Sequence, residues 1–595
     1  MMRRMRTPRQ FSSIAALVGI VSVGLVAAQG APQSETDKLS ALVASYASER
    51  AAIVGATPPA PGSLVVDRGP SGSPEQAQAL ANQATAYLAK LHALKVSRLT
   101  HDEWILYGIS ESQARLDAEN TAEFFWLPSP ITPYSSPLRT LAAPFANAPL
   151  KTQANLDAYM AALAQLPITM KAYETRLEAQ IQHGVALPRE ELRLSIPFVR
   201  ALAVAPPKSP FSVTASRLSA FSAAEQTAFA TRVDETIAAT VNPAIEGLAR
   251  YIDGPYRAHA VANVGVSQYP NGAAFYRYLI HLHTGLNLTP QQIHNRGLAE
   301  VARINRELEK LRVEAGFTGT IVEFKKYLRT DKRFYPTTAA EIGDKMMAAI
   351  RLIEPKMPQY FSMMPKAPYG VRRLALELEP SMTYGIYTLP ESTGASGYYN
   401  YNGRNPERRS NTMLTAIVFH ELLPGHHYQM NRLREDPRIT GIRQTVMYTA
   451  YTEGWGEYSS DLAREMGAYP DVWTKAGRLG MDLFTSSRLV VDTGMNALGW
   501  SRERAMQFMK DNTFEGDTQI DTETLRYSTD LPGQALAYKL GALSIKDARA
   551  RVEKAQGTSF DIRKFHDYLL DGGQMPLGMF DQHFTCWLTG EQHKK

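Results

Sequence analysis

The feature that most restricts the fold of this chain is a series of long stretches with helical periodicity, divided by proline-rich breaks. The stretch "TPQQIHNRGLAEVARINRELEKLRVEAG" (289–316) is the clearest, because its apolar residues recur along one helical face. Thr289 is placed to cap its start, and Pro290 falls in the first turn, where proline is tolerated. Further helical patterns lie at 35–55, 75–94 and 155–184, with breaks at 127–150 and 204–210. The sequence therefore predicts a mainly α protein.

Residues 375–402 depart from this pattern. They are rich in Tyr and Gly and carry turn signals, which predicts a small antiparallel sheet. The strand-like "GYYNYN" (397–402) could offer an edge to which an extended peptide adds as a further strand. We expect an N-terminal helix with a Pro/Gly-rich connector at 29–76, a helical lobe at 77–370 and a second lobe at 371–595.

The N-terminus has the pattern of a secretory signal peptide over residues 1–28. A basic start is followed by the apolar run "IAALVGIVSVGLVAA", with a cleavage site after about Ala28. The run is short for a membrane span, although an uncleaved anchor is the alternative. The only cysteine, Cys586, is remote from this site, which excludes a lipoprotein anchor and any intrachain disulfide. We expect a periplasmic or secreted protein without stable membrane insertion.

Composition narrows the classes of partner. Hydrophobic residues make up 44% and charged residues 21% of the chain, as in ordinary soluble proteins. The net charge of +6 falls to +2 when the four arginines of residues 1–28 are removed. This gives no electrostatic case for binding nucleic acid. The oligomeric state is left open.

The stretch "HELLPGHH" (420–427) resembles a zinc-binding helix with unusual spacing. In a regular helix His426 would lie about 9 Å along the axis from His420 and about 240° around it, too far to share an ion. Pro424, however, cannot donate a hydrogen bond to the His420 carbonyl, and Gly425 permits a turn with positive φ. The pair predicts a bend that brings His426 back beside His420, near the end of a helix capped by Ser410 or Asn411. Alternatively, His420 is a core histidine, and His426 and His427 lie on the surface.

A zinc site needs a third protein ligand and an open position. The segment 447–467 offers Glu453 and Glu457, four residues apart on one helical face and flanked by aromatic residues. Buried carboxylates need partners. We expect His420, His426 and Glu453 to hold Zn²⁺, and Glu457 to orient a ligating imidazole.

The motifs "HELLPGHHYQ" and "TEGWGEY" resemble those of the bacterial family called domain of unknown function 885. The resemblance continues through residues 281–304, 488–506, 526–541 and 565–577, nearly the whole mature chain. The family is similar to gluzincin metallopeptidases, which implies a large helical metallopeptidase-like fold with a deep cleft. "HELLPGH" also resembles the "HELLGH" of dipeptidyl peptidase three, which favours His426 over His427 as ligand. One departure is Asn496, where the family usually has His, and it could alter activity or specificity.

The resemblance implies a zinc-dependent hydrolase that cleaves peptides or oligopeptides. Zinc would activate a water, and Glu421 would act as the general base. Arg526, Tyr527 and Tyr538 are candidates to stabilise the oxyanion, although they could equally be packing residues. The alternatives are a metal-dependent amidase acting on a non-peptide or cell-wall amide, and a non-catalytic peptide-binding protein. Whether cleavage is endo- or exopeptidase-like is left open.

Overall fold

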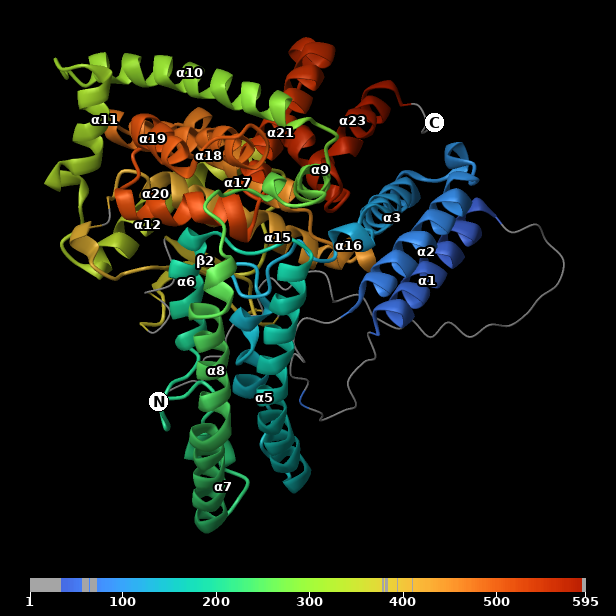
Figure 1. The fold of residues 1–595 in the computed structure, drawn as a ribbon. Coiled ribbons are helices and arrows are strands. Elements are labelled where there is room, and N and C mark those ends of the chain that lie inside the picture. Colours follow the sequence, from blue (N-terminus) through green and yellow to red (C-terminus); the bar gives the residue numbers. More distant parts are fainter. Residues whose placement is uncertain are drawn as a thin grey trace.

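The structure, a computed structural model, is mainly helical with one small mixed sheet (Figure 1). It describes residues 34–55, 64, 72–376, 379, 384–392, 394–408 and 410–590. The signal peptide predicted at 1–28 and most of the connector predicted within 57–76 lie outside these residues. Among the helices that are described, none contains an apolar stretch of the length needed to cross a membrane.

Three helices open the described chain and pack together (Figure 1, blue). They are α1 (Glu35–Val54), α2 (Pro74–His92) and α3 (His101–Glu119). The rings of Tyr46 and Tyr87 stack with centroids 4.2 Å apart. The Arg50 guanidinium pairs with Asp117 at 2.7 Å. The helix predicted at 35–55 is therefore present, and it packs on helices from the 77–370 segment.

The next helices form an arm that extends from the rest of the molecule (Figure 1, teal and green). After the short α4 (Ala143–Asn147) come α5 (Gln153–Gln182), α6 (Arg189–Arg200), α7 (Ala223–Thr236) and α8 (Asn242–Asp253), with the π-helical turn η5 (Ile237–Val241) joining the last two. The arm has its own apolar core, in which Leu163, Leu166 and Ile245 are fully buried.

The remaining helices build the body that carries the histidine motif. They are α9 (Gly272–Thr284), α10 (Pro290–Glu314), α11 (Ile321–Thr330), α12 (Ala339–Ile353), α13 (Met357–Tyr360), α14 (Leu414–Glu421), α15 (His426–Glu435), α16 (Ile442–Thr445), α17 (Thr449–Glu465), α18 (Val472–Ala497), α19 (Arg502–Asn512), α20 (Asp517–Leu525), η12 (Arg526–Asp530), α21 (Leu536–Gln556), α22 (Ile562–Asp571) and α23 (Phe580–Thr589). Helix α10 begins as predicted, with Thr289 and Gln292 forming a capping box. Helices α17 and α21 cross closely, since a Cβ added to Gly454 would lie 2.4 Å from the Cα atom of Gly541.

A small sheet is present as predicted, but it is mixed rather than antiparallel, and its first strand precedes the predicted segment 375–402. Its strands are β1 (Tyr369–Arg373), β2 (Gly385–Thr388) and β3 (Gly397–Tyr401), in the order β1-β3-β2. Strand β3 pairs parallel with β1 and antiparallel with β2. Two strands are parallel because the chain crosses over between them, and the crossing segment supplies β2. Since β3 is paired on both sides, the prediction that 397–402 offers a free edge for a peptide is wrong.

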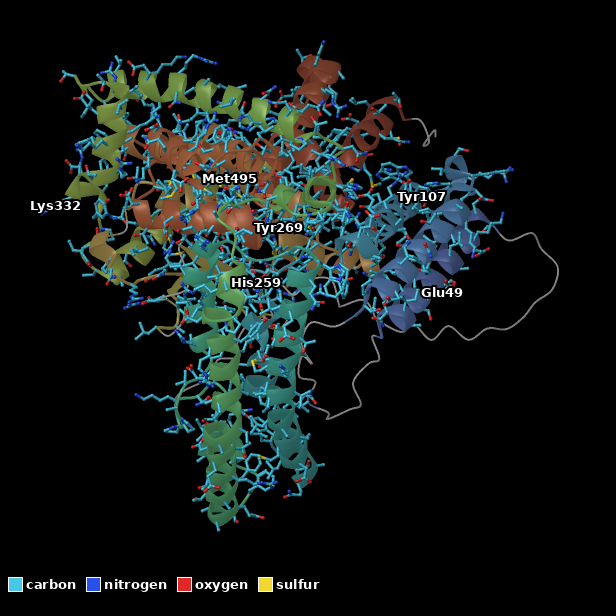
Figure 2. All side chains as sticks on the ribbon, in the orientation of Figure 1. Glu49, Tyr107, His259, Tyr269, Lys332 and Met495 are labelled. Atoms are coloured by element: carbon cyan, nitrogen blue, oxygen red, sulfur yellow. The ribbon has the colours of Figure 1, made fainter. Side chains whose placement is uncertain are left out.

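The arm joins the body beside the end of α18, in the region where Tyr269 and Met495 are labelled in Figure 2. Gly265 has a φ of 89°, and an added Cβ would lie 2.2 Å from the carbonyl oxygen of Met495. Only glycine fits so close an approach with this backbone conformation. The Gly265 amide donates to the carbonyl oxygen of Ser528 at 3.1 Å, which ties the loop to η12.

Candidate metal centre

The helix that carries His420 ends where the sequence predicts a bend. Helix α14 stops at Glu421 and α15 starts at His426, with Pro424 between them. The reason for Gly425 differs from the predicted one, because its φ is −76° and not positive. An added Cβ at Gly425 would lie 1.7 Å from the carbonyl oxygen of His420. Close backbone approach therefore requires this glycine.

The start of α14 also differs from the prediction. The helix begins at Leu414, and neither Ser410 nor Asn411 caps it. The Ser410 hydroxyl instead accepts from the Thr412 amide at 3.2 Å, and the Asn411 amide donates to the Phe334 carbonyl oxygen. The Ser410 bond is a local side-chain bond of the kind that competes with a helix.

Trp455 fixes the bend from the neighbouring helix α17. Its indole Nε1 donates to the carbonyl oxygen of Pro424 at 2.9 Å and lies 3.3 Å from that of Gly425. Trp455 is fully buried, and the Pro424 carbonyl lies in the bend between α14 and α15, whereas the Gly425 carbonyl also accepts from the Gln429 amide at 3.1 Å. The bond to Pro424 satisfies groups that would otherwise be costly to bury.

The bend brings the three predicted ligands together. The Nε2 atom of His420 lies 3.3 Å from Oε2 of Glu453, and Nε2 of His426 lies 3.5 Å from the same oxygen. One ligand atom from each residue lies within 4.8 Å of the other two. Two ligands of tetrahedral zinc, each at about 2.1 Å from the ion, are about 3.4 Å apart. The distances of 3.3 and 3.5 Å from the two Nε2 atoms to the Glu453 oxygen are close to this value.

His427 is held away from this cluster, next to the sheet. Its Nε2 lies 3.0 Å from the carbonyl oxygen of Ala367, and its Nδ1 lies 2.9 Å from the hydroxyl of Tyr387 on β2. The side chain is fully buried, and burial lowers the pKa of His427 to about 4, so the ring is neutral. The structure thus places His426, rather than His427, beside Glu453.

A buried chain of charges lies behind His420. The Nδ1 atom of His420 is 3.2 Å from Oε1 of Glu457, and Arg478 of α18 contacts the other Glu457 oxygen at 3.1 Å. Asp482 lies 3.9 Å from Arg478 and 2.6 Å from Lys539 of α21. Glu457 is therefore placed to orient the imidazole, as predicted, and Arg478 holds Glu457.

The electrostatics of the cluster favour a cation between the imidazoles and carboxylates. Although burial acts against it, interaction with Glu453 and Glu457 raises the pKa of His420 to about 10. Burial also opposes ionisation of Glu453, yet His420 and His426 hold the pKa of its carboxyl far below the ordinary range. The site thus attracts positive charge, which a proton or a metal ion can supply.

Glu421 ends α14 directly beside the first ligand. Burial raises the pKa of its carboxyl, and the positive potential of His426 and His420 opposes that rise. The side chain is partly exposed and can reach water. If an ion and a water occupied the cluster, a carboxylate next to His420 but outside the three converging groups would be a candidate proton acceptor.

The three residues predicted to stabilise the oxyanion have different environments in the structure. Tyr538 lies beside His420, with the two rings stacked at a centroid distance of 6.2 Å. Tyr527 is fully buried, where its hydroxyl donates to Glu523 and accepts from Arg488 at 2.6 Å. These two hydrogen bonds occupy the Tyr527 hydroxyl, so Tyr527 has a structural role. Arg526 donates to the side-chain oxygen of Gln534 at 2.7 Å and is partly exposed.

Asn496 has a structural role at the junction of arm and body. Its side chain is fully buried, and its Oδ1 accepts from the Val266 amide at 3.0 Å. Its Nδ2 donates to the carbonyl oxygens of Tyr527 at 2.9 Å and Asp492 at 3.0 Å. Every hydrogen-bonding group of the amide is therefore in use away from the three ligands.

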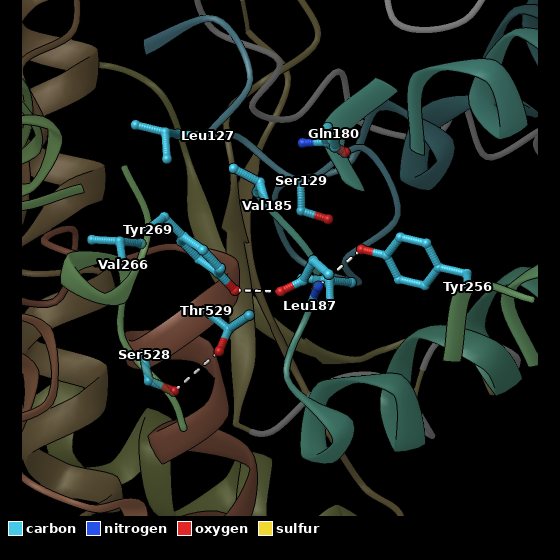
Figure 3. Close-up of a pocket in the computed structure, with 11 residues that line it drawn as sticks. Leu127, Ser129, Gln180, Val185, Leu187, Tyr256, Val266, Tyr269, Ser528 and Thr529 are labelled. Carbon is cyan, nitrogen blue, oxygen red and sulfur yellow. Dashed lines mark hydrogen bonds between the residues drawn. The ribbon is translucent and has the colours of Figure 1, made fainter. Parts of the chain in front are cut away.

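A small pocket lies at the same junction (Figure 3). Tyr256 and Tyr269 point toward the segment at residue 187 from opposite sides. The Tyr269 hydroxyl donates to the Ala186 carbonyl oxygen, and the Tyr256 hydroxyl accepts from the Leu187 amide at 2.9 Å. The pocket has a volume of 20 Å³, which holds about one water.

Gly456 is a site residue that sequence reasoning did not single out. An added Cβ at this position on α17 would lie 2.6 Å from Cε1 and 2.7 Å from Nε2 of His420. The second glycine of "TEGWG" therefore lets the imidazole pack against α17, and the doubled glycine was the only signal in the sequence.

We expect Gly456→Ala to reduce zinc affinity by about tenfold to hundredfold, as does the loss of a residue that orients a ligand. The added methyl displaces His420 and costs about 1–3 kcal/mol of stability through overpacking. Competition with a zinc-binding dye measures the affinity. The matched control is Gly247→Ala in α8, where the nearest atom is 3.9 Å away. Equal zinc affinity in the two variants would contradict this role.

Comparison with known proteins gives a family and two similar folds. A family model described as "Bacterial protein of unknown function (DUF885)" matches residues 50–584. No curated protein matches the chain. A structure from Colwellia psychrerythraea has a TM-score of 0.79 at 24% identity, covering 94% of this chain and 100% of that one. One from Shewanella oneidensis has a TM-score of 0.68 at 17% identity, covering 93% and 99%. Each is described as a "putative lipoprotein". These likenesses show the shared fold.

Proposed function

Because the chain belongs to the bacterial family DUF885, whose description assigns no function, we propose its activity from the metal centre. We propose a zinc-dependent hydrolase that cleaves the peptide bonds of peptides or oligopeptides. The observation that carries the proposal is the cluster of His420, His426 and Glu453, in which both imidazole Nε2 atoms lie 3.3 and 3.5 Å from one Glu453 oxygen, close to the spacing of tetrahedral zinc ligands. As part of the same proposal, we take the fold to be similar to that of gluzincin metallopeptidases and to contain a deep cleft.

The reaction is the addition of water to a peptide bond. When bound, zinc lowers the pKa of a water and polarises the scissile carbonyl. Glu421 accepts a proton from the attacking water as its oxygen bonds to the carbonyl carbon. The same carboxyl then donates that proton to the leaving amine as the C–N bond breaks. The products are a carboxylate and an amine.

Two further side chains assist this chemistry. Glu457, fixed by Arg478, orients the ring of His420. Tyr538 lies beside that ring, and in this proposal its hydroxyl donates a hydrogen bond to the developing oxyanion. Tyr527 no longer belongs among the candidates, because Glu523 and Arg488 already occupy its hydroxyl.

We place the protein in the bacterial cell envelope. The predicted signal peptide supports this location, and so do the lipoprotein descriptions of the two similar structures. A lipid anchor is not carried over from them, because the only cysteine of this sequence is Cys586.

The test is hydrolysis of a mixed peptide library by zinc-loaded protein. We expect cleavage that stops when a chelator removes the metal and returns when zinc is added. Mass spectrometry of the products measures both steps. Zinc binding at one ion per chain without cleavage of any peptide would favour the amidase or the binding protein. Cleavage that persists in the metal-free protein would contradict the proposal.

A further inference from the structure

Two arginines share one carboxylate close to the metal centre. Arg488 of α18 contacts Oε2 of Glu523 at 3.1 Å, and Arg526 of η12 lies 3.5 Å from Oε1 of the same residue. The side chains of Arg488 and Glu523 are 7% and 2% exposed, and that of Arg526 is 15% exposed. Two cations and one anion leave one positive charge unmatched in a largely buried place. Buried charge is costly unless it is paired.

The other buried groups that interact with these arginines do not supply a full anion. Burial raises the pKa of Asp492, which interacts with Arg526, to about 7, so that carboxyl is partly protonated at neutral pH. Glu515 accepts hydrogen bonds from Tyr384 at 2.7 and 2.8 Å, and burial raises the pKa of Glu515 to about 7, so it is partly protonated at neutral pH. Burial lowers the pKa of His283, near Arg526, to about 4, and that ring is neutral. Glu457 is already paired with Arg478 at 3.1 Å.

An aromatic ring lies near each of the two guanidinium groups. The Cζ atom of Arg526 lies 5.4 Å from the ring centre of Tyr134, and that of Arg488 lies 4.7 Å from the ring centre of Tyr538. These faces stabilise a cation only in part. Within the described chain, the buried Nε atom of Arg526 has no hydrogen-bond partner. An anionic ligand would satisfy both the charge and this donor.

Tyr538 separates the arginines from the metal centre by one ring. Its centroid is 6.2 Å from that of His420 and 4.7 Å from Cζ of Arg488. The guanidinium carbon of Arg488 is therefore within about 11 Å of the His420 ring, the reach of about three residues of extended chain. An anion at the arginines can belong to the same substrate molecule whose peptide bond lies at the metal.

We infer that Arg488 and Arg526 bind the C-terminal carboxylate of the peptide substrate, so that the protein is a carboxypeptidase that releases fragments of one to three residues. Planar guanidinium groups match the geometry of a carboxylate. The inference rests on the proposed function, because it takes the scissile bond to lie at the metal. It adds that the protein recognises its peptide substrate at the C-terminal end.

The experiment uses three sets of hexapeptides of randomised sequence. They end in a free carboxylate, in an amide, or in an amide preceded by Glu, which separates a terminal from a side-chain carboxylate. Binding is measured with full-length, zinc-loaded Glu421→Gln protein, and product lengths with the wild type. We expect the free-carboxylate set to bind about tenfold to hundredfold more tightly than either amide set, the effect of hydrogen bonds to a charged group. We expect released C-terminal fragments of one to three residues.

Second-site variants in the Glu421→Gln background assign the preference to the arginine pair. Arg526→Gln should remove most of it, and Arg526→Lys, which keeps the charge, should restore part of it. The matched control is Arg502→Gln, since Arg502 is also largely buried and pairs with Asp521 at 2.5 Å. It should leave the preference unchanged. Thermal unfolding verifies that each variant is folded.

The outcomes separate this inference from the proposed function. Equal binding of the carboxylate and amide sets, or no binding of any set, would overturn the inference. A preference for the Glu-containing amides would also overturn it, in favour of a side-chain carboxylate. If the wild type cleaves all three sets equally, the hydrolase stands and the carboxypeptidase does not. If no set is cleaved while the carboxylate preference is present, the hydrolase fails and the anion site stands.

Discussion

Glu421→Gln protein should bind zinc normally and hydrolyse peptides about a hundredfold to ten-thousandfold more slowly than the wild type, the range for loss of a general base. Glutamine has nearly the same shape but cannot accept and return a proton. Zinc should remain because Glu421 is not one of the three residues whose ligand atoms converge. Steady-state kinetics gives kcat, and elemental analysis gives the zinc content per chain.

The control for this variant is Glu465→Gln. Glu465 also lies on a helix of the body, but its carboxylate pairs with Arg549 and is 42% exposed. We expect its kcat to equal that of the wild type. A Glu421→Gln protein that keeps zinc and full activity would contradict the role of Glu421 as the base.

The two adjacent histidines provide the second prediction. His426→Ala should weaken zinc binding by at least about a hundredfold, because a direct ligand contributes more than a residue that only orients one. His427→Gln should keep the zinc affinity of the wild type. It should lose about 1–3 kcal/mol of stability, since the buried bonds to Ala367 and Tyr387 are disturbed. Dye competition measures affinity, and denaturant unfolding measures stability.

Each variant is the other's control, because both remove an imidazole from the first turn of α15. The reverse pattern, with zinc lost from the His427 variant only, would show that the ligand set is wrong. Equal loss in both would indicate a general disturbance of the bend at Pro424.

Helices with local signals could be predicted from the sequence. Thr289 and Pro290 mark the start of α10 by chemistry within one turn of chain. The direction of the strands could not be predicted in the same way. Strands β1 and β3 are parallel because a long segment crosses between them, and no local pattern encodes that path. Ser410 and Asn411 suggested a cap, but α14 begins later, at Leu414, and the Ser410 hydroxyl accepts from the Thr412 amide instead.

The bend at the metal centre could be predicted because Pro424 excludes a specific hydrogen bond. The residues that hold the bend could not be assigned, since they act across helices. Trp455 bonds to the Pro424 carbonyl, Gly456 makes room for His420, and Arg478 holds Glu457. These roles depend on how α14, α17 and α18 pack.

The different environments of Tyr527 and Tyr538 could not be predicted from the sequence either. The π-helical turn η12 (Arg526–Asp530) and the bend after it interrupt the helical register between them. Periodicity therefore cannot decide which tyrosine faces the metal centre. The structure places Tyr538 against His420 and buries Tyr527 against Arg488.

The central claim is that the bend at Pro424 and Gly425 makes His420, His426 and Glu453 a zinc site. Anomalous diffraction from zinc-soaked crystals, collected on both sides of the zinc absorption edge, tests it most directly. We predict one strong peak at about 2.0–2.2 Å from Nε2 of each histidine and from a Glu453 carboxylate oxygen. Absence of a peak there at saturating zinc, or a peak held by other residues, would contradict the claim.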